Sequence, residues 1–170
     1  MILTVFVKGY EKREIETMKF LLMLPTCKYH IKFETVETKD VGAFPRFIKE
    51  NWGIEDLIIM DHDIVPTQEQ IDSLLNCKED ACIYSYYIPI SATQGYYLLD
   101  SYGTGLVKFS LKFQKENNVN EVFNTNTFIN IDAKMNEYLK AHNYKWHNHG
   151  MVKHNHKVED LPEDYKLKSF

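Results

Sequence analysis

The sequence is poor in cysteine, and its three cysteines, Cys27, Cys77 and Cys82, are scattered without close spacing. Such a set argues against a disulfide framework and against a cysteine-rich zinc site, and it favours a reducing cytoplasm. No apolar run approaches the ~20 residues that a membrane-spanning helix needs. The chain starts with a strand-like run rather than a basic segment and a long apolar core, so we expect no signal peptide.

Positive charge is not in excess either, because the formal net charge is −4. This balance does not suit a surface that wraps nucleic acid, so no nucleic-acid partner is expected. The 170 residues suffice for one domain with a core but not for two ordinary ones, and no repeat or linker interrupts them. We expect one domain over residues 1–156 and a charged tail over 157–170.

The first half of the chain alternates between strand-like and helix-like segments. Strands are predicted over residues 2–7, 29–36, 57–60 and 81–87. Helices are predicted between them, and the third begins at Thr67, whose spacing to Gln70 matches a capping box. The other two run from Glu11 to Pro25 and from residues 40–42 to Gly53. This order predicts an α/β fold with a mostly parallel sheet flanked by helices.

The second half is less regular. A strand is predicted over 95–99 and a loop over 102–105, whereas 106–113 has no secure assignment and 115–126 is polar, rich in Asn and expected to be exposed. A helix begins at Asp132, which is well placed as its N-cap, and Asn143 suits a left-handed turn at its end. One or two short strands are predicted over 144–154.

The third predicted strand, Leu57-Ile58-Ile59-Met60, has no polar face and is followed by Asp61 and Asp63. A strand without a polar face is typical of the centre of a parallel sheet, whose carboxyl edge is where ligands bind in open α/β folds. Side chains two residues apart project to the same side, and two carboxylates form a hard-oxygen site suited to Mg²⁺ or Mn²⁺. A polar turn ahead of Pro66 explains the pair equally well.

Five of the seven histidines lie in one segment, and they are His142, His147, His149, His154 and His156. The last four form two pairs spaced by two, so each pair would face one way on a strand. Imidazole is a common ligand of transition metals, and the density of the pairs favours metal or phosphate contact. His142, on a predicted helix, is interpreted as an ordinary surface residue.

Three motifs in this order resemble glycosyltransferases of the GT-A fold. The run from Val41 to Ile54, with Gly42 and Arg46, leads into a hydrophobic strand and the Asp-x-Asp motif Asp61-His62-Asp63. Gly103-Thr104-Gly105 is similar to the small-residue loop on the acceptor side, and the segment from Met151 to His156 resembles the late strand whose His completes the metal site. The small size resembles compact GT-A proteins of some archaeal viruses.

The resemblance implies a single-domain, Rossmann-like hexosyltransferase that uses a UDP- or GDP-sugar, a glycan or protein acceptor, and Mn²⁺ or Mg²⁺. The implied metal ligands are Asp61, Asp63 and His154, with Asp61 contacting the ribose or acting through water, and Asp132 is the implied catalytic base. The donor would further contact Val7, Lys8, Gly9, Glu34, Arg46 and His156. The protein would act in the cytoplasm, that of the host if the chain is viral.

The sequence departs from the usual GT-A pattern at two places, and two other functions remain open. Asn-rich residues 124–130 replace the usual acidic and aromatic cluster, and His62 stands between the acids. The first departure leaves the base, and with it the choice between inversion and retention, undecided. The His-Asn-His strings at 147–149 and 154–156 also fit a metal-dependent nuclease or other hydrolase, and a GT-A-like domain that binds nucleotide or carbohydrate without catalysis is the second alternative.

Overall fold

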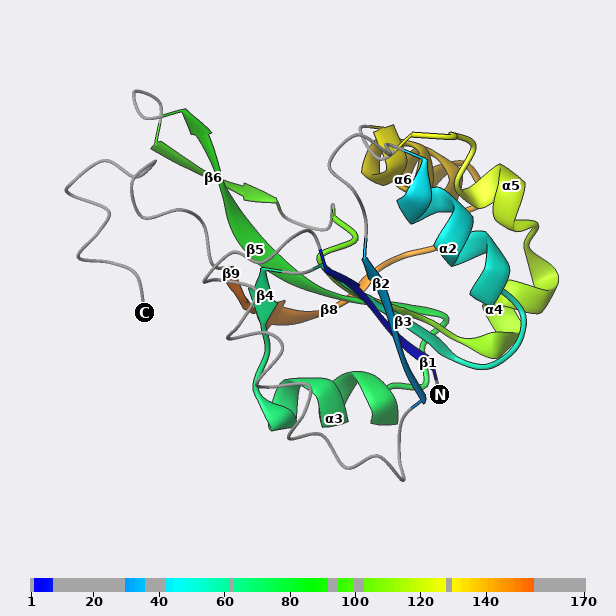
Figure 1. Ribbon diagram of the computed structural model, residues 1–170, viewed down its shortest axis with the longest axis horizontal. Coiled ribbons are helices and arrows are strands. Elements are labelled where there is room, and N and C mark those ends of the chain that lie inside the picture. Colours follow the sequence, from blue (N-terminus) through cyan, green and yellow to red (C-terminus); the bar gives the residue numbers. More distant parts are fainter. Residues whose placement is uncertain are drawn as a thin grey trace.

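The computed structural model describes residues 2–7, 30–35, 42–61, 63–91, 95–99, 103–127 and 130–154 (Figure 1). The helix predicted from Glu11 to Pro25 lies outside these residues, as does the predicted tail. So do Lys8, Gly9, His62 and His156. Within the described part of the chain, no helix is both long and apolar enough to cross a lipid bilayer.

The centre of the molecule is a mixed sheet in the order β2-β1-β3-β7-β5-β6, with β8 beside β5. Its strands are β1 (Ile2–Val7), β2 (His30–Thr35), β3 (Leu57–Met60), β5 (Ala81–Ser91), β6 (Gly95–Leu99), β7 (Leu106–Phe109) and β8 (His147–Met151). A separate two-stranded sheet pairs β4 (Ile64–Val65) with β9 (Lys153–His154). The α/β class and every strand that the sequence predicted within this region are confirmed.

The parallel prediction holds for part of the sheet only. β1 pairs in parallel with β2 and β3, and β5 pairs in parallel with β8. β7, which comes from the unassigned stretch 106–113, lies between β3 and β5 and is antiparallel to both. β3 and β5 therefore run in the same direction without being neighbours, because a later strand fills the space between them.

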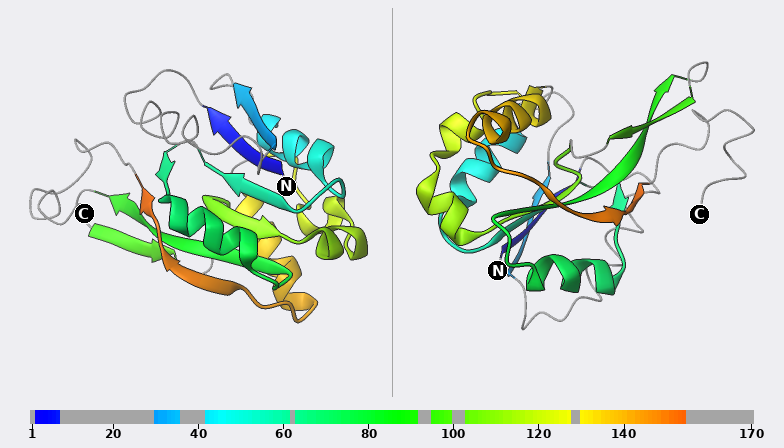
Figure 2. Two further views of the ribbon diagram at one scale, coloured as in Figure 1. Left: turned by 90° about the horizontal axis from the view of Figure 1, so that it is seen from below. Right: turned by 180° about the vertical axis from the view of Figure 1, so that it is seen from behind.

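Helices cover both faces of the sheet (Figures 1 and 2). α2 (Ala43–Asn51), α4 (Leu111–Glu116), α5 (Val119–Val122) and α6 (Ile131–Ala141) lie on one face, and α3 (Gln68–Asn76) lies on the other. The side chains of β3 alternate between two hydrophobic clusters, since Leu57 and Ile59 pack toward α2 and α6 whereas Ile58 and Met60 pack toward α3. All four are fully buried, which explains why this strand has no polar position.

The ends of the helices follow local sequence signals. Thr67 and Gln70 form the predicted capping box at the start of α3. Gly53 and Asn143, with φ values of 78° and 60°, take the left-handed conformation after α2 and α6. The predicted N-cap of α6 is wrong, because Asn130 precedes the helix and Asp132 lies inside its first turn.

The segment predicted to be polar and exposed, 115–126, contains the end of α4 and all of α5. Most of its side chains are exposed, but Val122 and Phe123 are fully buried and Asn117 is 6% exposed. Asn117 is tolerated inside because its amide donates to the Phe113 carbonyl and its carbonyl accepts from the Tyr138 hydroxyl.

A buried lysine binds the backbone at the C-terminal end of α3. Lys108 of β7 is 2% exposed, and its ammonium lies 2.8 Å from the Cys77 carbonyl and 3.5 Å from the Leu75 carbonyl, where the helix ends. It also forms an ion pair with Asp56 at 3.3 Å. A cation at this position satisfies carbonyls that have no partner within the helix and complements the helix dipole.

Candidate active site

The carboxyl ends of the parallel strands gather the predicted donor-binding residues at one edge. Val7 of β1 pairs with Thr35 of β2, beside Glu34, and Val5 pairs with Met60, which directly precedes Asp61. A crossover helix runs antiparallel to the strands that it joins, so Arg46, in the first turn of α2, lies toward the same edge. Lys8 and Gly9 continue β1 outside the described residues.

A tight turn follows β3. The Asp61 carbonyl accepts a hydrogen bond from the Ile64 amide at 3.3 Å, and the Asp61 amide donates to the Gly105 carbonyl at 2.9 Å. The interpretation of this stretch as a polar turn is therefore correct as far as the backbone is concerned. The turn leaves Asp61 partly exposed and places Asp63 in the interior, where it is only 7% exposed.

The buried carboxylate of Asp63 meets an imidazole from the far end of the chain. Nε2 of His154 lies 3.1 Å from Oδ1 of Asp63. The two residues come together because β9 pairs with β4 in a register that sets His154 opposite Ile64, the residue after Asp63. Nothing in the sequence between them predicts this register, but the contact itself joins the two residues that the resemblance assigned to one metal.

The His154 ring is held from two sides. Its Nδ1 lies 3.0 Å from the Tyr87 carbonyl, and because a carbonyl can only accept, Nδ1 carries the proton of that hydrogen bond. The Tyr86 ring packs edge-on against it with 4.8 Å between the ring centroids. This arrangement directs Nε2 at Asp63, which is the usual way in which a protein orients a metal-binding histidine.

A divalent cation fits the Asp63–His154 pair. Two ligands at ~2.1 Å from an octahedral ion and at right angles to each other are ~3 Å apart, close to the observed 3.1 Å. A third direct ligand is not in place in the described region, because the one group of three metal-binding side chains within 4.8 Å of one another is Cys77, His147 and His149. Asp61, Asp63 and His154 therefore do not form such a group.

The loop Gly103-Thr104-Gly105 connects the surrounding groups. Its Gly105 carbonyl holds the Asp61 amide, and its Thr104 amide donates to Oδ1 of Asp132 at 2.9 Å. A Cβ atom at either glycine would collide with the Tyr86 ring. The small residues of this motif are therefore required by the close packing of the loop on Tyr86.

Burial, helped by neighbouring negative charge, raises the pKa of two groups at this site. Burial raises the pKa of Asp132 to about 6, against the lowering effect of the hydrogen bonds from Thr104, and the nearby charge of Asp61 adds to the increase. Burial also raises the pKa of Tyr86, followed by the charges of Asp132 and Asp61. Asp132 is thus a carboxylate at neutral pH with more than ordinary basicity, which suits a general base.

Arg46 lies at a shallow pocket beside the start of α2. The pocket has a volume of about 240 Å³ and is lined by Gly42, Pro45, Arg46, Lys49 and Asn126. Arg46 is exposed, and the Lys49 ammonium is 3.5 Å from Oδ1 of Asn126. Two cationic side chains at one pocket suit an anionic group of a ligand.

Tyr86 and Tyr87 are functional candidates that the sequence did not single out. The Tyr86 ring packs against the glycine loop and against the His154 ring, and the Tyr87 carbonyl orients that histidine ring. In the sequence they belong to an ordinary aromatic strand, so no local signal separates them from core residues. In the sequence, Gly103 and Gly105 were the only signal that a large side chain packs closely against this loop.

Comparisons with known proteins give no family. No protein-family model and no curated protein matches the chain. Among solved structures, the chain is similar to one described as a glucose-1-phosphate thymidylyltransferase from Bacillus anthracis in complex with sucrose, with a TM-score of 0.42, 12% identity and 87% of each chain covered. A likeness at this level carries no argument about activity.

Proposed function

We propose that this chain is a metal-dependent glycosyltransferase of the GT-A type. It would move a sugar, a hexose in the simplest case, from a UDP- or GDP-sugar to a hydroxyl group of a glycan or protein. The observation that carries the proposal is the contact of Asp63 with His154 at the carboxyl edge of a buried central strand, because the Asp-x-Asp resemblance requires these two residues to meet.

Asp63 and His154 would hold Mn²⁺ or Mg²⁺, which supplies positive charge where the departing nucleoside diphosphate becomes more negative. The Tyr87 carbonyl keeps the imidazole aimed at Asp63. Asp61 would contact the ribose, and Arg46 and His156 would contact the phosphates. The backbone of Val7, Lys8 and Gly9 would bind the nucleoside, and Glu34 would accept hydrogen bonds from the base or the ribose.

Asp132 would take the proton of the acceptor hydroxyl. Its pKa of about 6 keeps it ionised at neutral pH while leaving it a better base than an ordinary aspartate. The Thr104 amide fixes one carboxylate oxygen, so the group is positioned before the acceptor arrives. A base in this role goes with inversion at the anomeric carbon, and the configuration of the product, read by NMR, tests that assignment.

The nuclease alternative is weaker in the folded chain than in the sequence. Its two His-Asn-His strings would have to serve one site, but His147 and His149 lie with Cys77 whereas His154 lies with Asp63. The net charge of −4 also disfavours a nucleic-acid substrate.

Thermal unfolding and transfer from a labelled donor test the proposal. The melting temperature of the wild type should rise when Mn²⁺ and UDP or GDP are added together, because a ligand that binds only the folded state stabilises it. Asp63→Ala and His154→Ala should lose this rise and the sugar transfer. Glu116→Ala, which removes an exposed carboxylate from α4, should keep both.

Equal nucleotide-dependent stabilisation of the wild type and of Asp63→Ala would show that the metal lies elsewhere. Stabilisation without transfer or hydrolysis of any labelled sugar nucleotide would instead indicate a non-catalytic binding protein. Stabilisation by metal alone, accompanied by cleavage of nucleic acid, would support the nuclease.

A further inference from the structure

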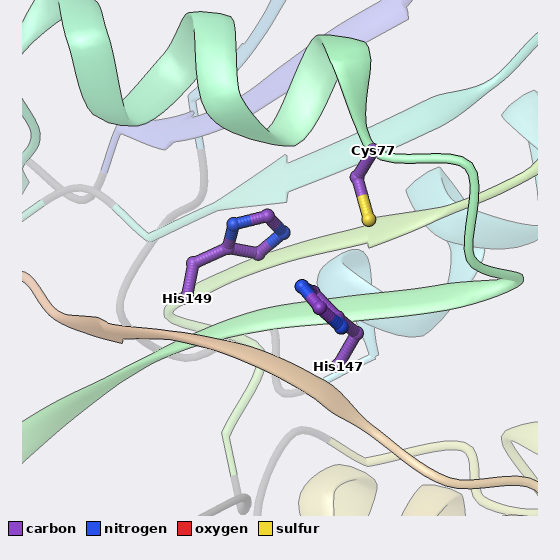
Figure 3. A group of neighbouring side chains, drawn as sticks. All are labelled: Cys77, His147 and His149. Atoms are coloured by element: carbon purple, nitrogen blue, oxygen red, sulfur yellow. The ribbon is translucent and has the colours of Figure 1, made fainter.

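A second group of metal-binding side chains lies away from the candidate active site. The ligand atoms of Cys77, His147 and His149 are all within 4.8 Å of one another. Figure 3 shows the three side chains directed toward a common space, Cys77 from the end of α3 and both histidines from β8. The group lies near the start of β5, and five residues of that strand, roughly 16 Å, separate Cys82 from Tyr87, which holds His154.

Backbone pairing brings these residues together. Cys77 is the residue that ends α3, and β8 pairs with β5 so that His147 stands opposite Cys82. His147 and His149 are two apart on a strand and therefore face the same side, with 4.6 Å between their ring centroids. The prediction that this histidine pair shares one face is thus correct.

The His149 ring is oriented as a metal ligand would be. Its Nδ1 lies 2.6 Å from the Ser73 hydroxyl of α3, which fixes the ring. Its Nε2 is buried and has no hydrogen-bond partner among the described residues. A buried nitrogen without a partner is unfavourable, and coordination of its lone pair to a metal ion removes that cost. The serine would then be the outer partner that ligating histidines usually have.

Cys82 is the fourth side chain at this place. It is fully buried, and its sulfur lies 2.8 Å from the sulfur of Cys77. The ammonium of Lys108, which binds the Cys77 carbonyl at 2.8 Å, brings a positive charge near the Cys82 sulfur. Burial and the neighbouring Cys77 nevertheless raise the pKa of the Cys82 thiol, so a metal ion that binds here has to displace the thiol proton.

We propose that Cys77, His147 and His149 bind one Zn²⁺ ion, with Cys82 as the fourth ligand. Two thiolates and two imidazoles in a tetrahedron are a set that selects zinc and not the Mg²⁺ or Mn²⁺ expected at Asp63. Zinc bonds of ~2.0–2.3 Å separate tetrahedral ligands by ~3.3–3.8 Å. The ligand atoms of Cys77, His147 and His149, within 4.8 Å of one another, are near this spacing. Cys82 lies outside that group, and its sulfur would have to move away from the Cys77 sulfur, now at 2.8 Å, to take the fourth position.

The zinc would act as a structural clamp. Among the elements that the structure describes, it would join the connection between α3 and β5 to the strand β8, and these two segments lie far apart in the sequence. This inference is independent of the proposed transfer reaction, because no ligand of the clamp belongs to the candidate active site.

Zinc and cobalt titration of the full chain tests the proposal. After chelator treatment and reduction, the protein should take up about one zinc ion per chain, and Co²⁺ should give the intense visible bands of a tetrahedral site and a thiolate charge-transfer band. Cys77→Ser and His147→Ala should each weaken zinc binding by at least about 100-fold, since loss of an outer partner alone can cost that much. Cys82→Ser should reduce the charge-transfer band by about half.

Two matched variants keep the test specific. His142→Ala removes an exposed histidine that stacks on Tyr138, and Asp63→Ala removes the ligand proposed for the other metal. Both should bind zinc like the wild type, and circular dichroism checks that all variants are folded. Because His147 is exposed, its replacement leaves the core untouched.

The proposal is overturned if the reduced wild type takes up no zinc, or if Cys77→Ser and His147→Ala bind it as tightly as the wild type. An unchanged charge-transfer band in Cys82→Ser would overturn the four-ligand set. A disulfide between Cys77 and Cys82, found by mass spectrometry in protein prepared under reducing conditions, would also overturn it. None of these results bears on sugar transfer, which depends on Asp63.

Discussion

Replacing Asp132 by Asn separates a catalytic carboxylate from a structural one. The pKa of this carboxyl is raised from 3.8 to about 6, chiefly by burial. The folded chain therefore holds the proton more tightly than the unfolded chain does, so the contribution of Asp132 to stability falls as pH rises from about 4 through about 6, and then levels off. A rise of about two pKa units, at about 1.4 kcal/mol each, corresponds to a penalty on the order of 3 kcal/mol at neutral pH.

The asparagine of this variant would carry no charge, and its side-chain carbonyl oxygen can still accept from the Thr104 amide. Asp132→Asn should therefore be more stable than the wild type by about 2–3 kcal/mol above about pH 7, and the difference should approach zero near about pH 4. Urea unfolding of both proteins in EDTA, across that pH range, measures this directly. The contributions of the other titrating groups to the pH dependence cancel, because only the difference in stability between the two proteins is used.

The same variant should lose sugar transfer by at least about 100-fold, the usual effect of removing a general base, while its nucleotide affinity stays unchanged. A pH-independent difference in stability would refute the electrostatic reasoning. A loss of up to about 1 kcal/mol at neutral pH, with transfer intact, would mean that Asp132 only stabilises the first turn of its helix through its negative charge.

Three further outcomes are expected. Gly103→Ala should destabilise the fold by about 1–3 kcal/mol because the new methyl group meets the Tyr86 hydroxyl, and Tyr86→Phe in the same chain should relieve part of this cost. In Gly105→Ala the new methyl group meets a ring carbon of Tyr86, so Tyr86→Phe should give no relief there. Urea unfolding of the two alanine variants, each with and without Tyr86→Phe, measures both effects. Equal relief at the two glycines would contradict the packing. Lys108→Ala should lower the free energy of unfolding by about 2–4 kcal/mol because it leaves buried carbonyls at the end of α3 without their donor, whereas a loss below about 0.5 kcal/mol would mean that water replaces the ammonium. Thr67→Ala should cost about 1 kcal/mol in the same assay through loss of the capping box, and an unchanged stability would show that the cap contributes nothing.

Local features of the fold were predictable because each depends on a few neighbouring residues. The apolar run at 57–60 indicates a strand covered on both faces, and the spacing of Thr67 and Gln70 indicates a helix start. Asn143 takes the left-handed conformation that few other residues tolerate. The histidines spaced by two share a face for the same reason, since alternation is a property of any strand.

Pairings between distant segments were not predictable from these patterns. β7 inserts between β3 and β5, and a run of four apolar residues does not reveal its neighbours. The residue type and position of Asp132 suit an N-cap, but its carboxylate instead accepts a hydrogen bond from the Thr104 amide, 28 residues away. Cys77 and Cys82 looked scattered in the sequence, and only the placement of β8 beside β5 sets two histidines against them.

The position of His154 in the chain has a consequence for biosynthesis. The carboxylate of Asp63 is translated long before its imidazole partner, and the pairing of β9 with β4 cannot form until that last segment leaves the ribosome. A nascent chain that ends before β9 therefore carries both acids but cannot form the contact between Asp63 and His154. Premature termination anywhere between them would release a product that holds the acids and lacks the imidazole.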